Sequence, residues 1–197
     1  MKTVPWAKES HRFLSKDELL AKVAIEEGPP TIGLQSDPFA ILIESIAGQQ
    51  LSGKAADAIL ERVKAAAGDI SPERLLASEE ALSGSCGLSR AKAGTILALS
   101  RAAVDGFDLN HLNGAPDEQV YERLTEFKGI GPWTAEMFMI FGLGRQDVMS
   151  PGDLGLRKGL KAAYGLEDVP TIKESGPLFE RWRPYRSAAC WYLWKIT

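Results

Sequence analysis

Hydrophobic residues recur every three or four positions along most of this chain, which is the spacing of a helix with one buried face. The pattern is clear in residues 39–46, 55–63, 93–103 and 120–127. Asp37-Pro38 and Ser89 precede two of these segments, as helix N-cap residues and a first-turn proline do. No segment alternates apolar and polar residues convincingly as a strand does. We therefore predict an all-α fold of roughly ten helices in two lobes.

Composition is that of a folded protein with a substantial core. Hydrophobic residues make up 45% of the chain and charged residues 25%. Cys86 and Cys190 are too few for a disulfide framework or a four-thiolate iron–sulfur cluster, so we predict that both are buried small side chains. No signal peptide or long apolar run is visible, and we expect an intracellular, cytoplasmic protein without a membrane partner.

A glycine turn separates two of the predicted helices. Gly129 and Gly131 both permit positive φ, and Pro132 suits the first position of the helix that follows. A helix start offers unpaired backbone N–H groups and the positive end of the helix dipole, so a phosphate can bind there without a basic side chain. From these residues alone, an ordinary turn between two helices is the alternative.

Two further polar features interrupt the apolar pattern. Asp153 follows Ser150-Pro151-Gly152 and begins another predicted helix, whose start stabilises the carboxylate as an anion. Gly48-Gln49-Gln50-Leu51-Ser52 separates two apolar helices, and Ser52 can cap the second. Taken alone, these features also fit a plain N-cap and a polar turn. Arg90 and Lys92, at a helix start, fit either solvated charges or phosphate contacts.

These motifs together resemble a known family. The string Phe127–Ala135, followed 22 residues after Gly131 by Asp153, is similar to the helix-hairpin-helix and aspartate signature of base-excision-repair DNA glycosylases. Within that superfamily the chain resembles the alkylation-repair branch, DNA-3-methyladenine glycosylase II. Residues 48–52 and 181–187 also match, so the resemblance covers about residues 37–197.

The resemblance implies a two-lobed, all-α helix-hairpin-helix glycosylase fold. It assigns residues 1–36 to an N-terminal segment that packs on the second lobe. Residues 37–115 form a six-helix-type lobe with a loop that wedges into DNA, and residues 116–197 contain the hairpin, the catalytic loop and the C-terminal helix. We expect the extra N-terminal antiparallel sheet domain of larger members to be missing, because residues 1–36 are short and lack strand alternation.

The same resemblance implies a monofunctional DNA glycosylase that flips out alkylated bases, chiefly N3-methyladenine and other N-alkylpurines, and hydrolyses the N-glycosidic bond. Asp153 would be the catalytic residue, because an ionised carboxylate stabilises the positive charge that develops on the deoxyribose and can orient the attacking water. Trp133 stands where strand-cutting relatives carry a lysine nucleophile, so we expect no β-lyase step.

The remaining site residues follow from the resemblance too. Aromatic faces attract a flat cationic base, which suits the expected substrate. Arg186 fits either a phosphate contact or a buried ion pair. We expect no cofactor for the chemistry. The assignments are a base pocket of Trp133, Met137, Trp194 and Gln49; a DNA wedge of Gln50 and Leu51; phosphate contacts from Gly129, Gly131 and Thr134; and a Na⁺ or K⁺ ion on the backbone carbonyls of Thr125, Phe127 and Gly129.

The expected partner is damaged double-stranded DNA, bound by a monomer associated with the nucleoid. The net charge of −3 is mild evidence against tight non-specific DNA binding. Residues 151–197 nevertheless contain eight Lys and Arg against five Asp and Glu. Two alternatives remain open: a glycosylase for another damaged base, and a non-catalytic helix-hairpin-helix DNA-binding module.

Overall fold

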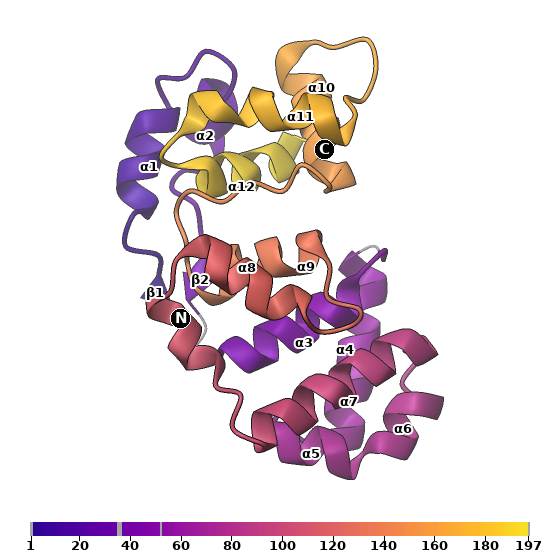
Figure 1. Ribbon diagram of the computed structural model, residues 1–197. Coiled ribbons are helices and arrows are strands. Elements are labelled where there is room, and N and C mark those ends of the chain that lie inside the picture. The colour runs from indigo at the N-terminus through magenta and orange to yellow at the C-terminus, as the bar shows by residue number, and fades with distance from the viewer. Residues whose placement is uncertain (1, 35–36, 52, 197) are drawn as a thin grey trace. The chain divides into compact units, whose positions relative to one another are not determined.

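The computed structural model describes residues 2–34, 37–51 and 53–196. Over these residues the chain forms twelve α-helices, and its only strands are the two-residue β1 (Lys2–Thr3) and β2 (Gly33–Leu34), which pair antiparallel. The all-α prediction is confirmed (Figure 1). Ser52, the expected cap, lies outside the described residues. Across the described ranges, no helix combines the length and the hydrophobicity needed to span a bilayer.

The chain divides into two compact units. We name Ser36–Phe138 the continuous unit, and Met1–Gln35 together with Met139–Thr197 the discontinuous unit. We expected a boundary at residues 115/116, but residues 116–138 group with residues 36–115. Hydrogen bonds explain the difference, because Thr95 and Gln49 bond to residues of the glycine turn and tie it to earlier helices of the continuous unit.

In the continuous unit, α3 packs against α4, α7 and α9 (Figure 1). Such a central helix needs apolar residues on nearly all sides, and six of its eleven residues are buried hydrophobic side chains. Its start is as predicted, since the Asp37 carboxylate accepts a hydrogen bond from the Phe39 N–H and Pro38 follows the cap. The elements are α3 (Pro38–Gly48), α4 (Gly53–Ala67), α5 (Pro72–Ala77), α6 (Glu79–Gly84), α7 (Arg90–Val104), the 3-10 helix η1 (Leu109–Gly114), α8 (Asp117–Thr125) and α9 (Pro132–Met137), which leads into a π turn, η2 (Phe138–Gly142).

In the discontinuous unit, α12 packs against α1, α2 and α10. Gly159 permits the closest approach of α10 and α12, because a Cβ there would lie 2.6 Å from the Leu193 carbonyl oxygen. Tyr192 is fully buried on α12, and its hydroxyl donates to the Gly28 carbonyl at 2.8 Å. The remaining elements are α1 (Ala7–Leu14), α2 (Ala21–Glu27), α10 (Leu154–Tyr164), α11 (Ile172–Phe179), the 3-10 helix η3 (Glu180–Trp182) and α12 (Arg186–Ile196).

Arg186 is a buried structural cation of the discontinuous unit. Its side chain is 9% exposed and forms ion pairs with Asp147 at 2.7 Å and Glu180 at 2.9 Å. Of the two roles expected for Arg186, the structure therefore supports the ion pair. Hydrogen bonding from Arg183, together with the charge of Arg186, lowers the pKa of Glu180. Cys86 and Cys190 form no disulfide and both are buried, which confirms the prediction for them.

Candidate active site

The glycine turn joins α8 to α9 as expected, but its two glycines have different backbones. Gly129 has φ +98°, whereas Gly131 is the N-cap of α9 with φ −100° and ψ −178°. Positive φ, which we expected to be useful at both positions, is therefore needed only at Gly129. Pro132 occupies the first turn, and no side chain caps α9. The helix thus starts on backbone groups alone.

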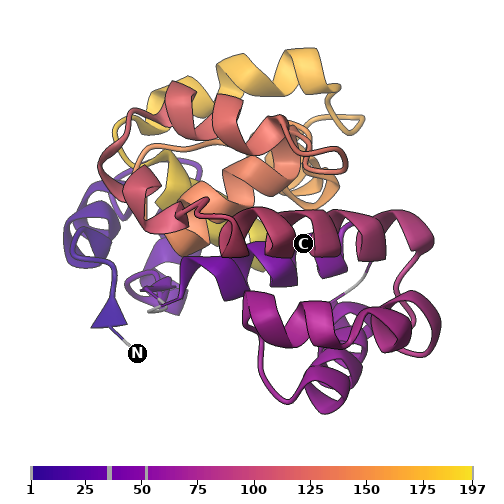
Figure 2. The same cartoon turned by 60° about the horizontal axis from the view of Figure 1, so that its bottom comes forward.

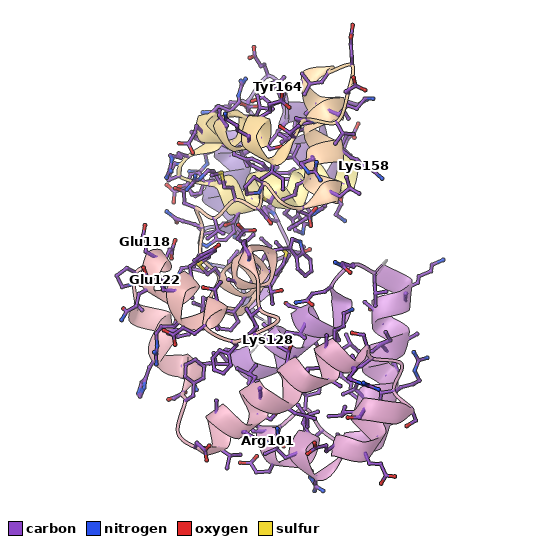
Figure 3. The ribbon with its side chains drawn as sticks, turned by 45° about the vertical axis from the view of Figure 1, so that its right-hand side comes forward. Arg101, Glu118, Glu122, Lys128, Lys158 and Tyr164 are labelled. Atoms are coloured by element: carbon purple, nitrogen blue, oxygen red, sulfur yellow. The ribbon has the colours of Figure 1, made fainter. Side chains whose placement is uncertain are left out.

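Helix α7 supports this turn from one side. The Thr95 hydroxyl lies 3.0 Å from the Lys128 carbonyl oxygen and 3.0 Å from the Ala91 carbonyl of its own helix. A Cβ placed on Gly129 would collide with the Thr95 side chain. Figure 3 labels Lys128 at the turn and Arg101 farther along α7, and both side chains are exposed. The sequence analysis did not identify Thr95, because a threonine inside a helix carries no distinctive signal.

Gln49 links the end of α3 to the same turn. Its side-chain Nε2 donates to the Gly129 carbonyl at 2.9 Å and to the Thr134 hydroxyl at 2.8 Å. The structure therefore brings together three residues that the sequence analysis assigned to the base pocket and to phosphate binding. In this arrangement the Gln49 amide positions the hairpin.

The same hydrogen bonds bear on the expected monovalent cation. The Gly129 carbonyl accepts from Gln49, and the Phe127 carbonyl accepts from the Ile130 N–H at 3.0 Å. Two of the three assigned oxygens thus already accept one hydrogen bond, and each of these carbonyls has a second lone pair. The cation remains a prediction from the resemblance, and no step proposed below depends on it.

Gln50 is a strained and exposed residue directly after α3. Its φ is +57°, and it is the one residue other than glycine with positive φ in the described ranges. For an L-residue this conformation costs about 1–2 kcal/mol. Leu51, next to it, is 41% exposed although it is a large apolar residue. Strain and apolar exposure at adjacent positions indicate a loop shaped for contact with something outside the chain.

Lys92, near the start of α7, contacts this loop. Its amine donates to the Gln49 carbonyl at 2.6 Å and to the Ala47 carbonyl at 2.8 Å. Burial lowers the pKa of Lys92. α7 lies beside α3 in the continuous unit (Figure 2). The amine therefore binds carbonyls at the end of α3, and it is not a solvated charge.

Asp153 is the N-cap of α10, with its carboxylate in a defined position. Its Oδ1 accepts from the Leu156 N–H at 2.8 Å and from the Trp194 Nε1–H at 3.2 Å. The Trp194 ring stacks on Phe141, with centroids 5.8 Å apart and planes 27° apart. Asp153 and Trp194, assigned separately from the sequence, are therefore in direct contact.

Gly155 lets the indole approach the start of α10. A Cβ at Gly155 would lie 3.1 Å from Asp153 Oδ1 and 3.2 Å from Trp194 Cδ1. Neither Gly155 nor Phe141 was recognised from the sequence, because a helical glycine and one phenylalanine in an apolar run are unremarkable without the partner helix. Figure 3 labels Lys158 and Tyr164 farther along the same helix α10, with Lys158 exposed.

Trp133 and Met137 both lie on α9, four residues apart and so on one face of the helix. Met137 is buried, and Trp133 is partly exposed. The assigned residues thus fall into two groups. The continuous unit contains the wedge, the turn, Gln49, Trp133 and Met137, and the discontinuous unit contains Asp153 and Trp194.

Comparisons with known proteins identify the family of this chain. A sequence model of the HhH-GPD superfamily of base excision DNA repair proteins matches residues 43–184. The chain is 36% identical to DNA-3-methyladenine glycosylase 1 of Schizosaccharomyces pombe, over 83% of this chain and 74% of the relative.

Solved structures give similar results. The S. pombe 3-methyladenine DNA glycosylase Mag1, in complex with abasic DNA, has a TM-score of 0.88 and 34% identity over 95% of both chains. The DNA-3-methyladenine glycosidase of Bacillus halodurans has a TM-score of 0.77 and 36% identity, covering 99% of this chain and 92% of its own.

Proposed function

Because this chain belongs to the HhH-GPD superfamily of base excision DNA repair proteins, we propose that it is a monofunctional DNA glycosylase for alkylated bases. Its substrates are N3-methyladenine and other N-alkylpurines in double-stranded DNA. The relatives named DNA-3-methyladenine glycosylase support this substrate class. The observation that carries the proposal is the Asp153 carboxylate, which caps α10 and is held through Oδ1 by Leu156 and Trp194.

In this proposal the continuous unit binds the DNA. Backbone N–H groups of the turn, at Gly131 and Thr134, bind a phosphate, since α9 has no side-chain cap. Gln50 and Leu51 enter the gap left by the flipped nucleotide. Their exposure and the strained backbone of Gln50 support this role. The turn and the gap-filling loop act as one rigid piece, because Gln49 hydrogen-bonds to both Gly129 and Thr134.

The chemistry depends on charge. An N-alkylated purine is already cationic, so it leaves without strong acid assistance, and positive charge then develops on the deoxyribose. Asp153 stabilises that charge and orients or deprotonates the attacking water. An aromatic face such as that of Trp133 favours a cationic base over undamaged bases, by about 1–2 kcal/mol when desolvated.

Asp153→Asn tests the proposal. Asparagine is as good an N-cap as aspartate, so α10 should persist while the negative charge is lost. We expect release of N3-methyladenine from a methylated duplex to fall on the order of 100-fold or more, measured under single-turnover conditions. Binding to an abasic duplex should stay close to that of the unmodified protein. Full activity of this variant would refute the assignment of Asp153.

Asp37→Asn is the matched control, because Asp37 caps α3 through the Phe39 N–H and plays no part in the proposed chemistry. It should retain full base release. A panel of alkylated, deaminated and oxidised duplexes separates the alternatives. Release of only a deaminated or oxidised base would indicate another substrate, and no release at all would indicate a DNA-binding module. Borohydride should trap no covalent adduct, since Trp133 replaces the lysine nucleophile.

A further inference from the structure

We propose that Lys92 is a positioning residue for the gap-filling loop. Its amine holds the peptide between Gln49 and Gln50, so that Gln50 keeps the left-handed backbone that presents its side chain to DNA. This inference rests on the proposed function, because it assumes that Gln50 fills the gap in the duplex.

The geometry couples the amine directly to one dihedral angle. The angle φ of Gln50 describes rotation between its own Cα and the preceding peptide group, whose oxygen is the Gln49 carbonyl. Lys92 Nζ lies 2.6 Å from that oxygen. It also lies 2.8 Å from the Ala47 carbonyl, which fixes the amine to the last turn of α3. With the flanking chain in place, relaxation of Gln50 to negative φ requires the Gln49–Gln50 peptide group to flip, which changes ψ of Gln49 and turns its carbonyl away from the amine. The hydrogen bond therefore opposes that relaxation.

The side chain of Gln49 is also held in place. The Gln49 side chain donates to Gly129 and Thr134 of the turn, while its carbonyl accepts from Lys92 on α7. Gln49 is thereby held by two different elements of the continuous unit. The strained Gln50 follows with little freedom to relax, which keeps the distance between the gap-filling loop and the phosphate-binding turn constant.

The choice of a lysine also fits this role. The end of a helix carries partial negative charge on its last carbonyls, which favours an ammonium group there. Burial disfavours the charged form of Lys92, so the position is not a random surface cation. Lys64 gives a useful contrast. It also reaches α3, but through the Glu44 carboxylate at 3.6 Å, outside the loop.

The experiment compares two substrates that differ in their need for the gap-filling loop. One is a duplex with N3-methyladenine paired to thymine. The other has the same lesion opposite an abasic-site analogue, where no partner base competes for the lesion. Lys92→Met keeps the side-chain length and removes the donor. It should slow release from the paired lesion about 10-fold more than from the unpaired one, which corresponds to about 1.4 kcal/mol.

Lys64→Met removes a cation from the same unit and should leave this ratio unchanged. Equal losses on both substrates for Lys92→Met would mean a general structural role, and no loss would mean no role, so either result overturns the inference. If Lys92→Met does not fold, Lys92→Ala, which also removes the donor and suits a helix, makes the same comparison.

A binding measurement separates this inference from the proposed chemistry. 2-Aminopurine paired with thymine should brighten when the loop unstacks it, and Lys92→Met should weaken the signal relative to Lys64→Met. If the unmodified protein releases no alkylated base but this difference persists, the proposed chemistry fails and the role of Lys92 stands. If the signal is the same in both variants, the role of Lys92 fails even when base release is normal.

Discussion

The starts of α9 and α10 differ in how their N-terminal backbone N–H groups are capped. Both helices begin after a proline- or glycine-containing loop and must satisfy unpaired backbone N–H groups. At α9 the N-cap is Gly131, which has no side chain to offer. At α10 the N-cap is Asp153, whose carboxylate accepts from the Leu156 N–H. One helix start is therefore suited to an anion from outside the chain, and the other carries an anion of its own.

The two starts are also held rigid by different means. The backbone of the turn before α9 is fixed by polar side chains from other helices, Thr95 and Gln49. At α10 the side chain of the cap itself is fixed, by the Trp194 indole that stacks on Phe141. The difference teaches that a group which binds by its backbone needs its dihedral angles restrained, whereas a charge that acts through space needs its side chain oriented.

The largest effect should come from Gly129→Ala. Alanine at φ +98° is strained, and its methyl group would collide with Thr95, so we expect a loss of roughly 3 kcal/mol in the free energy of unfolding. Chemical denaturation measures this loss, and binding to an abasic duplex should fall with it. An unchanged unfolding free energy would contradict the claim that this backbone is fixed by its neighbour.

Gly131→Ala is the control within the same turn. Gly131 has negative φ, and a Cβ there would meet no atom within 4 Å. Its stability should therefore stay near that of the unmodified protein. Affinity for DNA should still drop, because the added methyl group stands where a phosphate approaches the helix start. Loss of stability comparable to that of Gly129→Ala would show that the two glycines are equivalent.

A smaller effect is expected from Gly159→Ala, which tests the α10 side of the comparison. A Cβ there would lie 2.6 Å from the Leu193 carbonyl, so α10 and α12 would have to separate. The clash should exceed the gain in helix propensity and cost about 1–2 kcal/mol of stability. Because Trp194 lies on α12, base release should also slow.

Gly94→Ala makes the same replacement inside α7, where a Cβ would meet no atom within 4 Å. It should raise the melting temperature slightly, since alanine is the better helix former. If Gly159→Ala were as harmless as Gly94→Ala in thermal melting, the close approach of α10 and α12 would not matter for stability.

The smallest effect on stability should come from Trp194→Phe. Phenylalanine keeps a ring for stacking on Phe141 and removes the N–H that binds Asp153 Oδ1. Hydrogen bonds to charged groups contribute about 1.5–3 kcal/mol, and water can replace part of that, so we expect base release to slow about tenfold with little change in melting temperature. Trp191→Phe, on the same helix but in contact with Tyr192 and Lys195, should do neither. Equal rates of base release for Trp194→Phe and Trp191→Phe would show that the Trp194 N–H does not help to orient the Asp153 carboxylate.

Much of this fold could be predicted from the sequence because its signals are local. Apolar spacing gave the helices, and the caps at Asp37, Ser89 and Asp153 accept the backbone hydrogen bonds that their positions imply. The family followed from short motifs in a fixed order. The boundary expected at residues 115/116 lies before the hairpin, whereas the division by contacts lies after it, because those contacts join residues distant in the chain.

The supporting residues could not be predicted, for the same physical reason. Thr95, Phe141 and Gly155 act through partners 33 to 53 residues away, and nothing in their local sequence identifies the partner. Lys92 had two expected roles, and the structure shows a third, binding to carbonyls at the end of α3. Gln49 was expected beside the base, and its bond to the turn could not be predicted.

The division into a continuous and a discontinuous unit has a consequence for biosynthesis. Residues 36–138 leave the ribosome as one stretch and can collapse as soon as they emerge. Helices α1 and α2 are translated before this stretch, yet α12, against which they pack, is translated after it. The discontinuous unit can therefore complete its packing only after residues 36–138 have been synthesised.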